Sequence, residues 1–158
     1  MVGSIIADAG PLIALSSVGL LEKLFQQIRV PTEVVEESLY QNRQGAASIR
    51  EALDSGWLNA SDNVPDYELW KVPPSLGKGE VAAIYMALSN PGTLMVIDDR
   101  LARREALRLG LQIIGTVKVV VTAQQQGLIE DAEIVIQQMI ENGYRVSMAL
   151  LDRVKQDC

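Results

Sequence analysis

Short apolar runs alternate along the chain with longer segments in which apolar residues recur every three or four positions. The short runs predict buried strands and the longer spacing predicts amphipathic helices. Strands are expected at 4–7, 28–30, 93–97 and 112–114, with a short strand or edge segment at 57–60. Helices are expected at 12–16, 19–27, 33–40, 46–53, 77–89, 101–109, 117–126, 131–141 and 147–155.

Two segments between these elements predict irregular structure. Residues 9–11 form an Ala-Gly-Pro sequence that predicts a turn, and 61–74 contains three prolines and several acids, which predicts an exposed loop. Strands that alternate with helices indicate an α/β fold with a mainly parallel sheet. A chain of 158 residues fits one domain, 1–158, with the C-terminal helices from about 130 onward packing on it.

Residue usage narrows the chemistry that is open to this protein. The chain has no histidine, and its one cysteine is Cys158. Ser-His-Asp and Cys-His catalysis and His-ligated zinc are therefore excluded, which leaves mainly carboxylates. Oxygen ligands of this kind suit hard cations such as Mg²⁺ or Mn²⁺. No signal peptide or membrane-spanning run is visible, so a cytoplasmic protein is expected.

Acidic residues follow two of the predicted strands. Asp8 ends the first apolar run, and Asp98-Asp99 ends the longest one. Ligands of parallel α/β sheets bind at the carboxyl ends of the strands, so these acids are candidates for a shared site. Each also has a simpler explanation: Asp8 can form a turn before Gly-Pro, and one acid of the pair can cap the next helix.

Further acids occupy two predicted helices. Glu80 follows Gly77-Lys78-Gly79 in a first helical turn, where the helix dipole alone can account for a carboxylate. The glycines also permit a close approach of the backbone to another group. Glu36 and Glu37 lie in the helix 33–40, where both could be ordinary surface acids.

An ordered set of segments across nearly the whole chain resembles the PIN-domain family of nucleases. The first segment, 2–15, has a strand that ends in Asp8, followed by a small residue and Pro11-Leu12-Ile13. The other segments are 30–37 around Glu37, 76–83 around Glu80, 96–103 around Asp98-Asp99, 110–116, 127–129 and 143–147.

The resemblance implies a three-layer α/β/α PIN-like fold with a central, mainly parallel sheet. It also implies a Mg²⁺ or Mn²⁺ site and endonucleolytic cleavage of RNA. Many similar proteins are toxins of toxin–antitoxin modules that are inhibited by a small antitoxin protein, and many are homodimers. Carried over by position, Asp8, Glu37, Glu80 and Asp98 would be catalytic metal ligands, and Asp99 would be a further ligand or an acid that supports them. Glu36 is an alternative to Glu37 if the motif is aligned one residue earlier.

Two other functions remain open. The net charge of −6 counts against phosphate binding, so a catalytically weak or inactive PIN-like module that binds nucleic acid or protein is the alternative. A phosphoryl-accepting receiver domain would need its acidic pair early and its single acid late, which is the reverse of the order here.

Smaller candidates lie close to the acidic pair. Arg103 and Arg104 could contact RNA phosphates or form a solvated basic face that offsets Glu105. Thr116 could orient a water molecule or cap the following helix. Aromatic residues make up only 4% of the chain, which argues against a platform that stacks bases.

Overall fold

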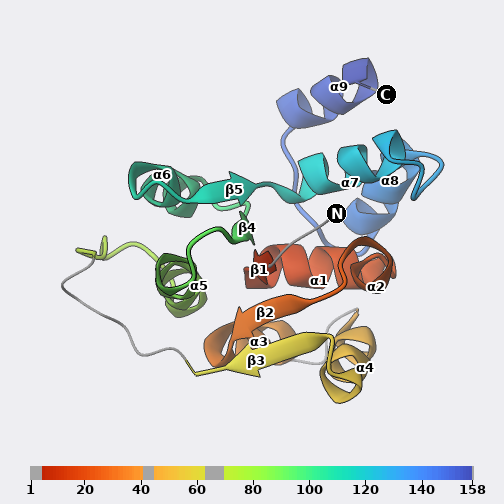
Figure 1. The fold of residues 1–158 in the computed structure, drawn as a ribbon. Helices are drawn as coiled ribbons and strands as arrows, with labels where there is room; N and C mark the ends of the chain where they lie inside the picture. The colour runs from red at the N-terminus through yellow and green to blue at the C-terminus, as the bar shows by residue number, and fades with distance from the viewer. Residues whose placement is uncertain (1–4, 41–44, 63–69, 158) are drawn as a thin grey trace.

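Five parallel strands form the central sheet of the computed structural model, which describes residues 5–40, 45–62 and 70–157. The strands are β1 (Ile5–Ala7), β2 (Ile28–Pro31), β3 (Leu58–Ser61), β4 (Leu94–Val96) and β5 (Gln112–Ile114). Figure 1 shows them in the order β3-β2-β1-β4-β5, from the bottom of the view to the top. All neighbouring strands are parallel, so the expected parallel α/β sheet is confirmed.

The direction in which the chain adds strands reverses between β1 and β4. From β1 the chain moves outward to β2 and β3, and it then crosses to the other side of β1 to form β4 and β5. In the register of these two central strands, Ala7 lies opposite Val96. The residues that follow, Asp8 on one strand and 97–98 on the other, therefore leave the sheet side by side. Crevices at such reversals are where open α/β sheets bind ligands.

Helices cover both faces of the sheet. Ile5 and Ala7 point to one face, where they share a core with α1 (Ala9–Ser17), α7 (Thr116–Gln125) and α8 (Ala132–Glu141). Ile6 points to the other face, as the alternation of a strand requires, and packs with α5 (Lys78–Ser89) and α6 (Arg100–Arg108). The three-layer α/β/α architecture is thus confirmed.

The beginning of the chain departs from expectation at residues 9–11. The predicted turn is wrong, because α1 begins at Ala9 and runs through Gly10 and Pro11. Proline is tolerated there because the first N–H groups of a helix have no partner within the helix. The next helix, α2, covers only Leu21–Leu24 and not 19–27, although Phe25 beyond its end is buried.

Trp70 corrects the prediction that 61–74 is an exposed loop. Residues 63–69 lie outside the described ranges, but the Trp70 side chain is 2% exposed. Its ring meets Tyr85 of α5 edge-on, with centroids 5.3 Å apart, and its Nε1 donates to Glu105 Oε2 at 3.1 Å. The tryptophan therefore fixes this segment to α5 and α6.

The remaining helices of the described residues are α3 (Thr32–Leu39), α4 (Ala46–Ser55) and α9 (Met148–Asp157). Both α8 and α9 pack against α7, and their residues Ile136, Met139 and Val154 join the core that contains β1. No helix among the described residues has the length and apolar character needed to cross a membrane.

Candidate metal-binding active site

Asp8 and Asp98 emerge from adjacent strands at the reversal of the sheet. The Asp8 N–H donates to Val96 O at 3.0 Å, and the Ile97 N–H donates to Ile114 O at 3.0 Å. The strand ladder thus extends one residue beyond the assigned strands on both sides of β4. Both acids follow directly on this ladder, as their positions at strand ends predicted.

The Asp8 carboxylate is buried without a partner for one of its oxygens. The residue is 7% exposed, and within the described part of the chain Oδ1 accepts no hydrogen bond. Burial raises the pKa of Asp8 from 3.8 to about 7, and the charges of Glu80, Glu37 and Asp98 add to this rise, while the Ala9 N–H opposes it. The side chain does not cap α1, so the helix start does not explain it.

Glu37 of α3 lies close to Asp8 at the start of α5. A Cβ atom built on Gly79 would lie 2.7 Å from Glu37 Oε2 and 3.7 Å from Asp8 Oδ1. Both oxygens therefore lie within 4 Å of one point that only the absence of a side chain keeps open. Glu37 also contributes to the raised pKa of Asp8, so the structure brings Glu37 toward Asp8 and favours it over Glu36.

Glu80 has a structural role and also belongs to the acidic cluster. Its Oε2 accepts from the Gly77 N–H at 3.2 Å, which satisfies one free donor at the start of α5. Burial nevertheless raises the pKa of Glu80, the Gly77 N–H opposes the shift, and the charges of Asp99 and Glu37 increase it. The position of Glu80 at the start of α5 therefore explains one of its contacts, but not its place among the other acids.

Three donors fix the Asp98 carboxylate. Thr116 N donates to Oδ1 at 2.8 Å, Thr116 Oγ1 donates to Oδ2 at 2.7 Å, and the Tyr144 hydroxyl donates to Oδ2 at 3.0 Å. Burial raises the pKa of Tyr144, and the nearby charge of Asp98 raises it further. Thr116 therefore binds an acid of the site and does not act as the cap, which is Gly115.

Asp99 and Arg103 flank this carboxylate. Asp99 is the N-cap of α6, where its Oδ2 accepts from the Ala102 N–H at 2.9 Å. Arg103 donates to Ile97 O at 3.0 Å, and both its guanidinium and Asp98 Oδ1 lie within 3.4 Å of the position of a Cβ on Gly115. Arg103 is therefore half-buried and bound to the end of the strand, whereas Arg104 is exposed, as the alternative of a solvated basic face requires.

The donor set fits a divalent cation. It offers hard carboxylate oxygens around a gap kept open by Gly79, and one of them is buried with no partner in the part of the chain that the structure describes. Within 5–40, 45–62 and 70–157, no three acidic side chains are arranged to enclose a metal ion by themselves. Because like charges repel one another, the carboxylates stay apart when no cation offsets their charge. They would have to move closer together to bind one.

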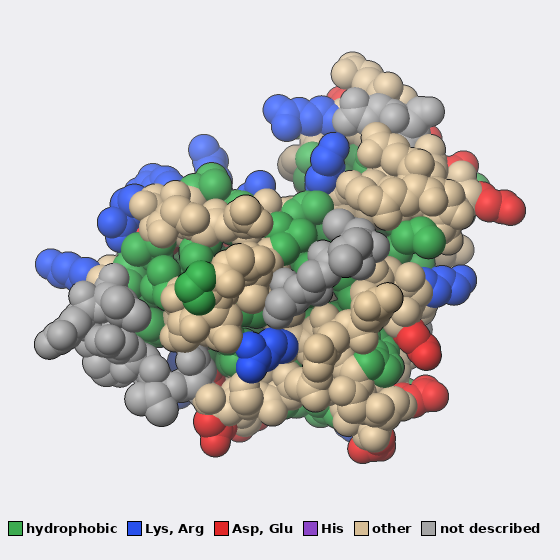
Figure 2. Space-filling view, viewed as in Figure 1, with side chains coloured by type: hydrophobic (Ala, Val, Ile, Leu, Met, Phe, Trp, Pro, Cys, Tyr) green, Lys and Arg blue, Asp and Glu red, His purple; other side chains and the backbone are tan. Residues whose placement is uncertain are grey.

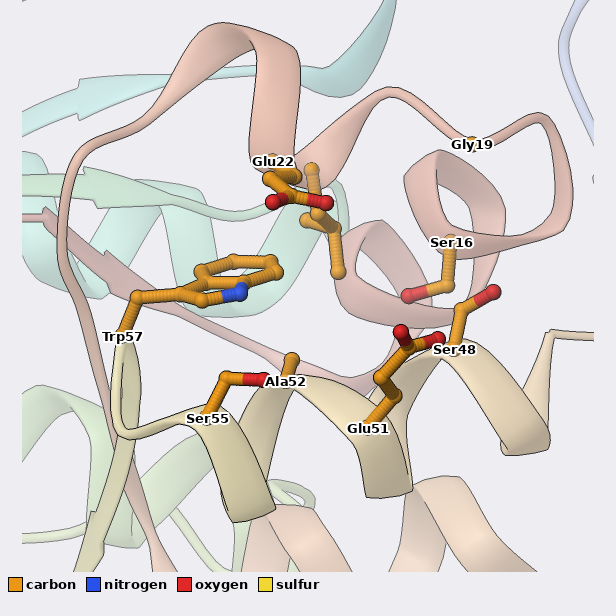
Figure 3. A pocket seen from close by; sticks show the side chains of 9 residues that line it. Ser16, Gly19, Glu22, Ser48, Glu51, Ala52, Ser55 and Trp57 are labelled. Carbon is orange, nitrogen blue, oxygen red and sulfur yellow. The ribbon is translucent and has the colours of Figure 1, made fainter.

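A separate small pocket lies at the opposite edge of the sheet. Figure 3 shows Glu22, Glu51 and three serines around a cavity of about 100 Å³ beside Trp57, which directly precedes β3. None of the predicted site residues lines it, and it lies toward the N-terminal ends of β2 and β3. Larger hollows, of about 870 Å³ and about 570 Å³, border Asp98 instead.

Fold and site together define an α/β/α protein with a carboxylate cluster at the switch point of a parallel sheet. Residues 4–158 match the family model described as a PIN domain, so the chain belongs to the PIN-domain family. PIN domains are generally nucleases, which indicates a hydrolase-type module that acts on nucleic acid. Searches of curated proteins and of solved structures each gave no significant match.

Proposed function

We propose that this protein is a metal-dependent endoribonuclease in which Asp8, Glu37, Glu80 and Asp98 are the catalytic metal ligands. Mg²⁺ or Mn²⁺ is the proposed ion, and Asp99 is a further ligand through the oxygen that does not cap α6. The observation that carries the proposal is the buried Asp8 Oδ1, which has no hydrogen-bond partner among the described residues and lies near Glu37 at the gap above Gly79. A buried carboxylate without a partner is costly and is explained most simply by a bound cation.

Each residue of the site would have a distinct role. When bound, a divalent cation would lower the pKa of an attacking water and offset the charge that develops on the phosphate. Thr116 and Tyr144 hold the Asp98 carboxylate in one orientation, as supporting groups around metal ligands do. Arg103, beside Asp98, supplies a positive charge where a phosphate would approach.

Cleavage of RNA by the purified protein tests this proposal. The protein is incubated with RNA and Mn²⁺ or Mg²⁺ beside two variants that each remove one negative charge, Asp98→Asn and the exposed Asp54→Asn. Wild type and Asp54→Asn should cleave internal bonds only when the metal is present, and Asp98→Asn should lose activity. Equal cleavage by all three, or cleavage by none, would contradict the proposal.

The proposal includes a role as the toxin of a toxin–antitoxin module, which is supported by the resemblance to such toxins. Induced expression should arrest growth in wild type and not in Asp98→Asn, and co-expression of the small inhibitor protein should relieve the arrest. Light scattering of the purified protein tests the associated expectation of a homodimer.

A catalytically weak or inactive PIN-like module is the second candidate. It is favoured by the net charge of −6 and by acids that do not yet form a closed metal site in the described residues. Thermal unfolding with increasing Mn²⁺ separates the two candidates, because a ligand that binds only the folded state raises its stability. No stabilisation by metal, together with no cleavage, would support the second candidate.

A further inference from the structure

A wide groove runs from the acidic site between α6, α7 and α9. It has a volume of about 870 Å³ and begins at Asp98. Its walls combine the starts of α6 and α7 with the segment before α9 and with α9 itself. The basic residues that line it are Arg100, Arg103, Lys118, Arg145 and Arg153. We call this hollow the basic groove.

The charge of the basic groove is opposite to that of the protein as a whole. The chain carries a net charge of −6, yet the lining includes five Lys and Arg side chains and Asp98 as its acidic member. Figure 2 shows Lys and Arg side chains on both sides of the notch between α9 and α6, while acidic side chains lie mostly toward the other edges. Five of the 14 Lys and Arg residues of an acidic protein thus line one hollow next to its candidate active site.

Four of these cations have no ionic partner in the part of the chain that the structure describes. Arg100, Lys118, Arg145 and Arg153 are exposed, and the ion pair found among the described residues joins Arg108 to Glu105. Unpaired cations that face one hollow repel one another, so no internal contact explains their grouping. An anionic ligand with several charges would explain it.

The basic groove also continues past Asp98. Tyr144, Arg145 and Asp98 line a second hollow of about 570 Å³, which lies against α1 near Gly10 and Ser17. The two hollows therefore adjoin at Asp98 and are separated by the segment that carries Tyr144. A chain-like ligand in the basic groove would pass directly over Asp98, one of the candidate catalytic acids.

We propose that the basic groove binds the sugar–phosphate backbone of a single RNA strand and leads it across Asp98. The proposal rests on the ribonuclease function proposed above and adds that α9 and the segment before it form one wall of the substrate path. Tyr144 is the aromatic residue of the lining, so the groove offers at most one ring for stacking and no series of aromatic rings along its length. Binding should therefore depend on phosphates and very little on base sequence.

An acidic segment of a partner protein is the competing occupant. RNA is favoured because the groove begins at Asp98, a proposed metal ligand beside which a phosphodiester must lie in order to be cleaved. A partner that merely filled the groove would have no need of Asp98. The two occupants are distinguished by direct binding of RNA.

The test compares two double variants that are matched by helix and by charge. Arg100→Ala with Arg153→Ala removes two cations of the groove, one on α6 and one on α9. Arg104→Ala with Lys155→Ala removes two exposed cations from the same helices that are not among the groove residues. Both variants shift the net charge equally. Affinity for a short fluorescent single-stranded RNA is measured in EDTA, without cleavage, over a range of salt concentrations.

The groove double variant should bind RNA roughly tenfold more weakly near physiological salt, and its logarithmic salt dependence should be shallower by about 1.4, or 0.7 for each lost phosphate contact. The control should bind like wild type, and RNAs of different base sequence should bind alike. A second pair, Lys118→Ala with Arg145→Ala, should reproduce the loss.

Equal affinities for wild type, groove variants and control would overturn the proposal and leave a protein partner as the occupant. Cleavage by wild type in Mn²⁺ would show in that case that the ribonuclease function still holds. Conversely, loss of binding in the groove variants without any cleavage by wild type would support the groove and contradict the nuclease function.

Discussion

Asp8→Asn should change how the stability of the metal-free protein depends on pH. The substitution keeps the size of the side chain and removes its charge. In wild type, burial and the neighbouring acids hold the pKa of Asp8 at about 7, against an ordinary 3.8. At 1.36 kcal/mol per pKa unit, the buried charge lowers the free energy of unfolding by about 4 kcal/mol once it is fully formed.

The direction follows from proton binding. Between the two pKa values the folded state holds a proton on Asp8 that the unfolded state has lost, so wild-type stability falls as the pH rises. The difference in stability between Asp8→Asn and wild type should therefore move in favour of the variant by about 1.4 kcal/mol per pH unit from about pH 4 to 7. Above about pH 7 it should level off.

Urea unfolding in EDTA across this pH range measures the effect. The exposed Asp54→Asn variant is the control and should track wild type at every pH. Added Mn²⁺ should stabilise wild type at pH 8 and leave Asp8→Asn unchanged, because the cation needs this carboxylate. A difference between Asp8→Asn and wild type that stays constant with pH, or moves in favour of wild type as the pH rises, would refute the reasoning.

Three further substitutions test other contacts. Gly79→Ala would place a Cβ 2.7 Å from Glu37 Oε2, so calorimetric titration should show weaker Mn²⁺ binding, whereas Gly77→Ala, with no atom within 4 Å, should bind normally. Tyr144→Phe removes one donor to Asp98 and should lower kcat in cleavage kinetics. The same substitution should lower the free energy of unfolding in urea by about 1 kcal/mol. Trp70→Ala should destabilise the fold by about 3–5 kcal/mol in the same unfolding assay; a loss under 1 kcal/mol would contradict the buried position of the ring.

The strand-end acids could be predicted because their placement follows from local pattern and sheet geometry alone. A buried apolar run predicts a strand, parallel strands share a carboxyl edge, and Asp8 and Asp98 each follow such a run. The same reasoning predicted four of the strands and the parallel arrangement, and it left 57–60, where β3 lies, as a short strand or an edge segment. It could not choose between Glu36 and Glu37, because that choice depends on how α3 is rotated against α5 at Gly79.

Other features depend on contacts between distant segments. Tyr144 lies 46 residues beyond the acid that it binds, and nothing near it in the sequence indicates that contact. Trp70 lies beside prolines and acids that predict a loop, and its burial depends on Tyr85 and on Glu105. A tryptophan in a polar segment is the one signal that could have predicted a buried anchor, since so large an apolar surface seldom remains in water.

The hydroxyl of Tyr144, in the C-terminal part of the chain, donates to the carboxylate of Asp98 at the end of a central strand. A disturbance that loosens the end of the polypeptide would therefore remove one of the three donors that orient Asp98, while Thr116 and the sheet stay in place. Activity should for that reason be lost on heating before the bulk of the secondary structure unfolds. The local stability of the C-terminal segment would then set how long the protein stays active at a given temperature.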